Sequence, residues 1–178
     1  MARPDLTGVL LVGGASARFG SPKALARLHG ERLADRAWRL LGEACEERLA
    51  VGKAADALAL PFDVVDDRTE TRAALAGIVA GLNTATNEIA VIVPVDMPRL
   101  TPELLLELAA ACTNAAAPRG SPLPAAYRKN ALPLLERRLS EGALVLHDAL
   151  DELDAVRLPV DETQLDNVNT PDDLRRLG

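Results

Sequence analysis

Aromatic residues are scarce in this chain and make up only 2 % of its 178 residues. A protein that binds single-stranded nucleic acid by stacking needs a platform of aromatic side chains, so the composition argues against that class. The net charge of −6 argues equally against broad binding to a phosphate backbone. We therefore predict no nucleic-acid partner, and we expect a few local cations to hold any anionic ligand.

Cysteine and histidine are also rare, with two residues of each. Cys45 and Cys112 lie far apart in the sequence, whereas a secreted disulfide scaffold carries a dense set of cysteines, so we interpret both as buried, reduced thiols. His29 and His147 show no zinc-ligand spacing, and no nucleophile stands near them in sequence. We interpret both histidines as surface or packing residues, because the pattern indicates neither a zinc site nor a catalytic triad.

Long apolar runs are missing as well. No stretch approaches the roughly 18 apolar residues that cross a membrane, and the first residues lack the apolar core of a signal peptide. We expect a cytoplasmic protein with no membrane partner. The hydrophobic fraction of 48 % is ordinary for a globular protein, and the length predicts a single domain over residues 1–178.

Strand and helix patterns alternate along the chain. Strands are predicted at 6–12, 48–51, 62–65, 89–95, 125–127 and 156–160, and helices at 33–41, 75–82, 101–108, 132–139, 144–150 and from 170 onward. This alternation predicts a three-layer α/β/α sandwich with a mostly parallel, Rossmann-like sheet. Residues 118–124 are rich in Pro, Gly and Ser and are predicted to form an exposed loop.

A loop of small residues follows the first predicted strand. Gly13 and Gly14 stand at its start and Gly20 at its end, while Arg18 lies inside it and Lys23 just beyond it. Glycines let backbone N–H groups approach an anion, and cations add charge. Because the spacing matches neither the P-loop nor the dinucleotide fingerprint, we predict another type of phosphate loop. A plain strand-to-helix turn is the alternative.

Two carboxylates follow predicted strands. Asp96 comes directly after the strand at 89–95, where a single carboxylate suits Mg²⁺, since this ion takes its remaining ligands from water and substrate phosphates. The alternative is an aspartate that stabilises a turn. Asp67 follows the strand at 62–65, where it would bind ribose hydroxyls or a second metal, or belong to a solvated turn. Ligands of parallel sheets bind at the carboxyl ends of strands, so we expect the glycine loop and both aspartates to meet there.

A third polar segment lies near the end of the sequence. Thr170 and Asp173 form a capping box around a proline, which predicts a helix start without any function. Asn167 and Asn169 precede it, and they either bond local backbone or reach the site.

The glycine loop resembles the signature of the nucleotidyltransferases, L-x-G-G-x-x-x-R-[MF]-G-x-x-K, which cradles a nucleoside triphosphate. The matching residues are Leu11, Gly13, Gly14, Arg18, Phe19, Gly20 and Lys23. Within this class the chain is similar to the molybdenum cofactor guanylyltransferases from Leu6 to Leu177. Three further segments carry that resemblance: Leu75-Ala76-Gly77, Val95-Asp96-Met97-Pro98 and Asn167-Val168-Asn169-Thr170-Pro171-Asp172-Asp173-Leu174.

The resemblance implies the fold of the nucleotide-diphospho-sugar transferases and an Mg²⁺-dependent reaction. In that reaction GMP passes from GTP to the terminal phosphate of molybdopterin, and pyrophosphate leaves, so GTP and molybdopterin are the implied substrates. Proteins that deliver the molybdenum cofactor are candidate partners. By position, the implied nucleotide-binding residues are Leu11, Val12, Gly13, Gly14, Lys23, Gly52, Asp67 and Asp96. Gly52 lies near the base, Asp96 also binds Mg²⁺, and Arg18 and Lys23 stabilise the leaving pyrophosphate.

The sequence departs from the family at three places. Ala73-Ala74 replaces a Gly-Pro, Ser121-Pro122 stands where His-Pro or Gln-Pro is usual, and Ala143 replaces an arginine. The last two segments are expected on the molybdopterin side. Two alternatives therefore stay open: a related transferase that uses CTP or another phosphorylated acceptor, and a nucleotide-binding protein without catalytic activity.

Overall fold

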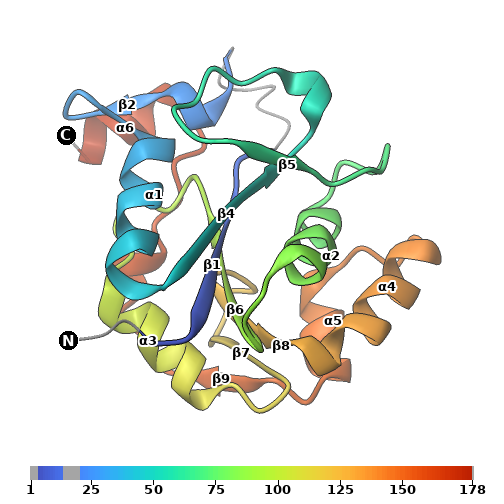
Figure 1. Cartoon of the computed structure of the whole chain (residues 1–178). Coiled ribbons are helices and arrows are strands. Elements are labelled where there is room, and N and C mark those ends of the chain that lie inside the picture. Colours follow the sequence, from blue (N-terminus) through green and yellow to red (C-terminus); the bar gives the residue numbers. More distant parts are fainter. Residues whose placement is uncertain (1–3, 14–20, 178) are drawn as a thin grey trace.

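The computed structural model describes residues 4–13 and 21–177, and its centre is a seven-stranded sheet with helices on both faces (Figure 1). The strand order is β5 (Val64–Asp66), β4 (Glu47–Gly52), β1 (Leu6–Leu11), β6 (Ile89–Pro94), β8 (Ala125–Arg128), β7 (Ala115–Pro118) and β9 (Val156–Leu158). Only β8 runs antiparallel to its neighbours; the other adjacent strands of this sheet are parallel. The predicted α/β/α sandwich with a mostly parallel sheet is confirmed.

The helices form two layers. One layer holds α1 (Leu33–Ala44) and α3 (Pro102–Ala111), and the other holds α2 (Ala74–Thr84), α4 (Leu132–Ser140) and α5 (Leu146–Glu152) (Figure 1). The central strand β6 is buried between them, and its residues 90–93 are fully buried. Its continuous apolar run is thus explained by helices on both faces.

The strand order reverses between β1 and β6. From β1 the chain builds β4 and β5 on one side, then crosses to β6 on the other side of β1. The carboxyl ends of β1, β4, β5 and β6 share one edge of the sheet because these strands are parallel. In open α/β sheets such a reversal leaves a crevice at that edge, and ligands bind there.

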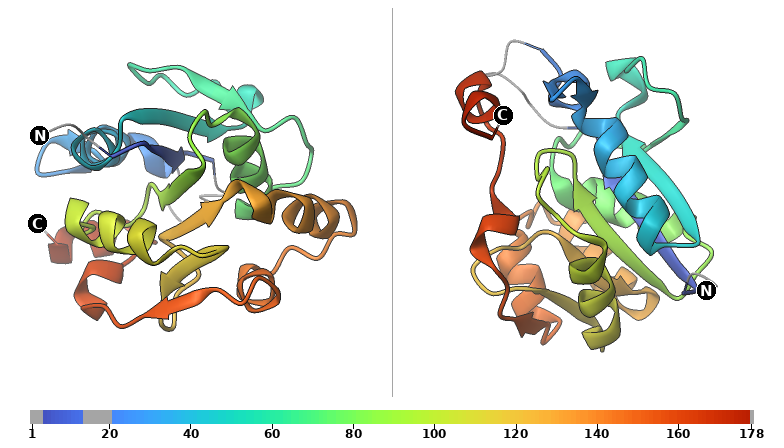
Figure 2. Two further views of the ribbon diagram at one scale, coloured as in Figure 1. Left: turned by 60° about the horizontal axis from the view of Figure 1, so that its bottom comes forward. Right: turned by 90° about the vertical axis from the view of Figure 1, so that its left-hand side faces the viewer.

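The C-terminal segment runs from β9 to the short helix α6 (Pro171–Leu177) (Figure 2). This helix contacts the small hairpin of β2 (Arg27–Leu28) and β3 (Glu31–Arg32). The predicted capping box at the start of α6 is confirmed. Thr170 Oγ1 accepts from Asp173 N at 3.2 Å, and Asp173 Oδ2 accepts from Thr170 N at 2.8 Å. Thr101 likewise caps α3 by accepting from Leu104 N at 3.3 Å, as its position before a proline predicts.

The structure contains one strand that was not predicted, and one predicted exposed loop that is in part buried. Strand β7 was not predicted, because a run of alanines has little intrinsic strand preference, and here pairing with β8 and β9 decides its conformation. The segment 118–124 is not an exposed loop throughout. Arg119 and Gly120 are exposed, but Leu123 and Pro124 are buried where the chain returns toward the sheet.

The expectations for the cysteines and the histidines are met. Cys45 and Cys112 are both buried and neither forms a disulfide, and His29 and His147 are both exposed. Among the residues that the structure describes, no helix combines the length and apolar character needed to cross a bilayer.

Candidate nucleotide-binding site

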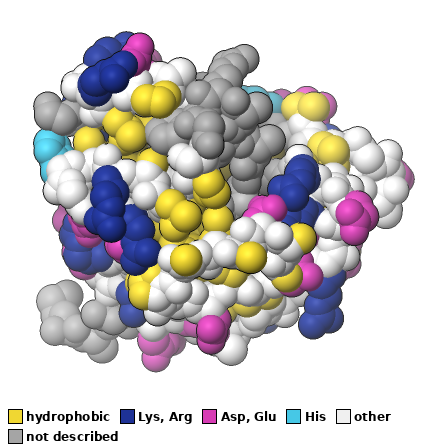
Figure 3. Space-filling model, turned by 90° about the horizontal axis from the view of Figure 1, so that it is seen from above, with side chains coloured by type: hydrophobic (Ala, Val, Ile, Leu, Met, Phe, Trp, Pro, Cys, Tyr) yellow, Lys and Arg dark blue, Asp and Glu magenta, His cyan; other side chains and the backbone are white. Residues whose placement is uncertain are grey.

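A cleft of about 820 Å³ opens at the reversal point of the sheet. Its described lining comes from the carboxyl ends of β1, β4 and β6, the start of α2 and several connecting segments, and includes Leu11, Val12, Gly13, Lys23, Gly52, Lys53, Asp56, Asp67, Arg72, Ala73, Ala74, Asp96, Ser121, Leu123 and Asn167. Figure 3 views the molecule from this edge and shows apolar side chains gathered near the centre of the face, with Lys and Arg side chains around them. Of the glycine loop and the two aspartates that were expected to meet, Gly13, Asp67 and Asp96 line this one cleft, whereas residues 14–20 of the loop lie outside the described residues.

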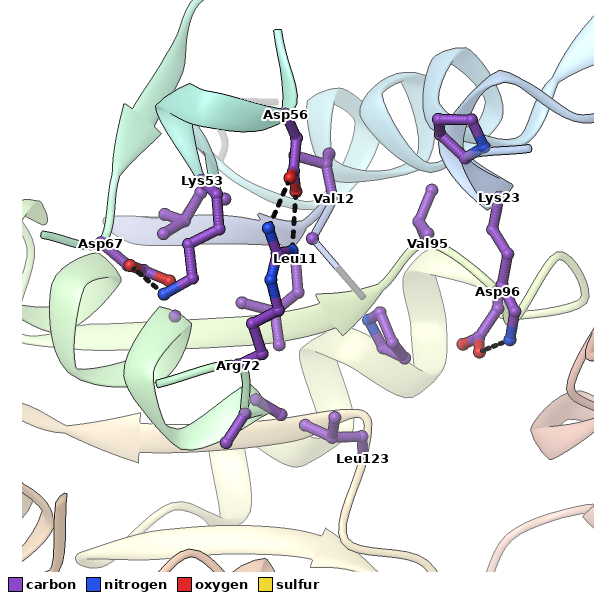
Figure 4. A pocket seen from close by; sticks show the side chains of 18 of the residues that line it. Leu11, Val12, Lys23, Lys53, Asp56, Asp67, Arg72, Val95, Asp96 and Leu123 are labelled. Carbon is purple, nitrogen blue, oxygen red and sulfur yellow. Dashed lines mark hydrogen bonds and ion pairs between the residues drawn. The ribbon is translucent and has the colours of Figure 1, made fainter. Parts of the chain in front are cut away.

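Lys23 and Asp96 form an ion pair at one end of the cleft (Figure 4). Lys23 begins a single 3₁₀ turn, and Asp96 follows β6 by two residues. The Lys23 Nζ lies 3.0 Å from Asp96 Oδ2 and 2.9 Å from Asn169 Oδ1. The two ion-pair side chains remain 19 % and 24 % exposed. An ammonium and a carboxylate that both reach the cleft can bind phosphate oxygens and a hard cation, respectively.

The C-terminal segment completes this end of the cleft. Val168 is fully buried, and its N–H donates to the carbonyl oxygen of Asp96 at 2.8 Å. On either side of it, Asn167 lines the cleft and Asn169 accepts from Lys23. The open question from the sequence is thereby answered, because both asparagines reach the site although more than 140 residues separate Asn169 from Lys23.

Asp173 fastens this segment, and its role predicts an effect of pH. The backbone N–H of Asn169, and then hydrogen bonds with Thr170, lower the pKa of the Asp173 carboxyl to about 2. A carboxyl whose pKa falls on folding stabilises the folded form above its unfolded pKa near 3.8, and this stabilisation is lost as the pH falls toward 2.

We expect the amides of Asn169 and Thr170, which donate to Asp173, to be protected from hydrogen exchange at pH 5 and to lose protection several-fold near pH 2.5. In Asp173→Asn the protection at pH 5 should already be lower and should change little with pH. The amide of Val91, in the central strand, is the internal control. Equal pH dependence in the variant and the unchanged protein would contradict this role of Asp173.

A second ion pair, between Lys53 and Asp67, was not predicted. The Lys53 Nζ lies 2.7 Å from Asp67 Oδ1 and 2.8 Å from the carbonyl oxygen of Thr71, and it also donates to the carbonyl oxygen of Thr69. Its three N–H donors thus have three acceptors. The Lys53 and Asp67 side chains are only 11 % and 6 % exposed. Lys53 therefore fixes the loop from Asp66 to Arg72, hereafter the 66–72 loop.

A sequence signal for this pair did exist. Lys53 follows β4 and Asp67 follows β5, and these strands are parallel neighbours in which Gly52 pairs with Asp66. Opposite charges placed one residue beyond paired positions are expected to meet. The sequence alone does not show that β4 and β5 are neighbours, so this pair could be predicted only once the strand order was known.

The third pair joins Asp56, in the turn that follows β4, to Arg72, which precedes α2, and both residues line the cleft (Figure 4). Arg72 Nη2 lies 2.9 Å from Asp56 Oδ1, and Nη1 lies 3.3 Å from Oδ2, which gives a two-pronged contact. The Arg72 hydrogen bonds lower the pKa of Asp56. Unlike Lys53–Asp67, this pair is open to solvent, since the Arg72 side chain is 51 % exposed and the Asp56 side chain 25 % exposed.

Backbone from two strands forms the floor between these pairs. Val12 N donates to the carbonyl oxygen of Val51 at 3.0 Å, which extends the β1–β4 ladder to the edge of the cleft. At Gly52 an added Cβ would lie 3.0 Å from Val12 Cγ2 and 3.4 Å from Gly13 N, so the close approach of these strand ends favours glycine there. Gly14 and Arg18 lie outside the described residues, so their predicted roles stay predictions.

The places where the sequence departs from the family pattern also have positions in the structure. Ala73 and Ala74 line the cleft at the start of α2, and Ser121 lines it on the side of β8. Ala143 stands in the connection between α4 and α5 and is not part of the described lining.

The fold and the site together define a class of protein: α/β domains of the nucleotidyltransferase type, with a ligand cleft at the reversal of a mostly parallel sheet. Residues 8–156 match the model of the MobA-like NTP transferase domain, and the chain belongs to this family.

Individual relatives agree with this assignment. The chain is 36 % identical to a probable molybdenum cofactor guanylyltransferase from Chloroflexus aggregans, over 96 % of this chain and 92 % of the relative. It is 33 % identical to a protein of the same description from Deinococcus radiodurans, over 97 % and 94 %. Among solved structures, molybdopterin-guanine dinucleotide biosynthesis protein A from Archaeoglobus fulgidus superposes with a TM-score of 0.82 at 28 % identity, covering 96 % of each chain.

Proposed function

We propose that this protein transfers GMP from GTP to the terminal phosphate of molybdopterin and releases pyrophosphate. The observation that carries the proposal is the Lys23–Asp96 pair, which faces the cleft at the reversal of the sheet. The names of the relatives support the choice of GTP and of the molybdenum cofactor. Cofactor delivery proteins and a cytoplasmic location stay predictions.

Asp96 fits the expected magnesium ion. It is one carboxylate at the end of a buried strand, its side chain is partly exposed, and the amide of Asn167 lines the same cleft. Mg²⁺ favours such sites, since it keeps several waters and takes further ligands from substrate phosphates. We propose that Asp96 holds Mg²⁺, which when bound neutralises phosphate charge during the transfer.

Lys23 has the complementary role. Its ammonium, which Asp96 and Asn169 orient, binds phosphate oxygens of the nucleotide and stabilises the negative charge on the leaving pyrophosphate. Arg18 is proposed to assist it, and the backbone of Leu11, Val12 and Gly13 to contact the nucleotide. The attacking phosphate of the acceptor is already ionised near neutral pH, so the transfer needs positioning and charge stabilisation and no general base.

The acceptor is proposed to bind between Ser121 and Asn167. Both residues line the cleft, and Asn167 is joined through Val168 to the backbone of Asp96. An acceptor phosphate placed there approaches the α-phosphorus from the side of β6 and β8. The Asn167 amide can donate to and accept from the heteroatoms of a pterin, whereas the Ser121 hydroxyl, which donates to the carbonyl oxygen of Leu123, can serve as an acceptor.

The test is release of pyrophosphate from GTP, with and without purified molybdopterin and with and without Mg²⁺. We expect release only when GTP, acceptor and Mg²⁺ are all present. CTP in place of GTP should give little product and a smaller thermal shift. A larger shift with CTP would overturn the guanylyl assignment, and tight GTP binding without pyrophosphate release would favour a binding protein without activity.

A further inference from the structure

We propose that Asp56 and Arg72 recognise the edge of the guanine base and thereby select GTP. This inference rests on the proposed function, and it assigns a role to two residues that the sequence motifs do not include. Both side chains line the cleft, and they hold each other through two contacts of 2.9 and 3.3 Å.

Asp56 and Arg72 lie in a different part of the cleft from the Lys23–Asp96 pair. The Lys23–Asp96 pair stands at the end of β6, whereas Asp56 and Arg72 lie near the middle of the view in Figure 4, between that pair and the Lys53–Asp67 pair. A nucleoside triphosphate carries its phosphates at one end and its base at the other. When the phosphates lie against Lys23, the base therefore points toward the Asp56–Arg72 pair.

The surroundings of this pair suit a flat aromatic ring. Leu58, Ala73 and Ala74 line the same part of the cleft and offer small, apolar surfaces. The start of α2 lies tightly on β1 here, since a Cβ on Gly77 would come within 2.7 Å of Leu11 Cδ2. Small side chains leave room for a base, and apolar ones favour removing its faces from water.

The other charged residues of the described lining are committed elsewhere. Lys23 and Asp96 belong to the phosphate end, and Lys53 and Asp67 are nearly buried against each other and the 66–72 loop. Asp56 and Arg72 differ because a quarter of one side chain and half of the other are exposed. They can reach a ligand without breaking a buried contact.

The chemistry of the pair matches guanine. The guanine edge presents N1–H and the 2-amino group as adjacent donors, which one carboxylate can accept together. Its O6 and N7 are acceptors, which arginine binds in the way it binds guanine in DNA. Each carboxylate oxygen has two lone pairs, so Asp56 can accept from the base while it still holds Arg72. Adenine would instead direct its acceptor N1 toward a carboxylate.

The experiment measures equilibrium binding of GTP, ITP, ATP and CTP with Mg²⁺. ITP is the key probe because its base lacks only the 2-amino group. We expect the unchanged protein to bind GTP about tenfold or more tightly than ITP, the effect of one hydrogen bond to a charged group. In Asp56→Asn the GTP affinity should fall about tenfold or more, and the GTP-to-ITP ratio should approach one.

The second variant separates the two side chains. Arg72→Gln should weaken GTP and ITP alike, by about tenfold, because both bases carry O6 and N7. Asp63→Asn and Arg68→Gln are matched controls, since both residues are exposed and absent from the described lining; Asp63 precedes β5, and Arg68 lies in the same 66–72 loop as Arg72. Both controls should bind like the unchanged protein. Melting curves without nucleotide verify folding, and Asp56→Ser repeats the test if Asp56→Asn is unstable.

The possible failures are distinguishable. If the unchanged protein prefers GTP but Asp56→Asn and Asp56→Ser keep the full GTP-to-ITP ratio, the base-recognition role is overturned and the proposed function stands. If the unchanged protein binds CTP more tightly than GTP, the guanylyl function fails, and this inference fails with it.

Discussion

Replacing Asp96 by alanine is expected to lower the rate of pyrophosphate release by about a hundredfold or more, the typical effect of removing one preorganised charge stabiliser. Lys23→Ala should have an effect of the same order. The physical reason is that both side chains meet at the end of β6 with their charged atoms 3.0 Å apart, where one is proposed to hold Mg²⁺ and the other the phosphates.

The measurement is turnover at saturating GTP, molybdopterin and Mg²⁺, so that weakened binding does not disguise the chemical step. Asp151→Ala is a suitable control because Asp151 lies in α5 and forms an exposed pair with Arg157, a type of contact that contributes little. Near-normal turnover of Asp96→Ala under these conditions would refute its assigned role.

Lys53→Met is expected to lower the free energy of unfolding by about 3–5 kcal/mol, far more than the loss of an exposed ion pair. Methionine keeps most of the aliphatic stem but leaves the Asp67 carboxylate without its partner, although that side chain is only 6 % exposed. The carbonyl oxygens of Thr69 and Thr71 also lose their shared donor. The 66–72 loop should therefore loosen.

Denaturant unfolding of single and double variants tests this expectation. Lys53→Met combined with Asp67→Asn should recover part of the lost stability, because the double variant no longer buries an unpaired charge. Arg99→Met is the exposed counterpart, since Arg99 and Asp166 form a pair of similar distance with about half of each side chain in solvent. It should cost no more than about 1 kcal/mol. A Lys53→Met variant as stable as Arg99→Met would contradict the proposed importance of the buried pair.

Much of the fold could be predicted because local patterns report on burial. The continuous apolar run of β6 predicts a strand with both faces covered, and two helical layers cover it. The capping residues Thr101 and Thr170 predict the starts of α3 and α6, because a cap depends on atoms within four residues. Strand β7 was missed for the converse reason: alanines carry no strong local preference, and the neighbouring strands decide.

Some residues of the candidate site could likewise be placed from local patterns in the sequence, and others could not. Gly13 and Asp96 could be placed at strand ends from the sequence, and strand ends of a parallel sheet share an edge. The partners of these residues could not be placed. Lys53 and Arg72 escaped notice because neither stands in a recognisable motif, although each forms an ion pair that lines the cleft.

By itself, then, the amino-acid order determined the class of fold, the position of the glycine loop after the first strand and the family to which the chain belongs. Only the tertiary structure decided that Asn169 reaches Lys23, that Lys53 neutralises Asp67, and that Asp56 and Arg72 face the cleft together. The reason is physical: helix caps and apolar periodicity act over a few residues, whereas charge pairing depends on which strand ends lie side by side, and the order of strands in the sheet sets that arrangement.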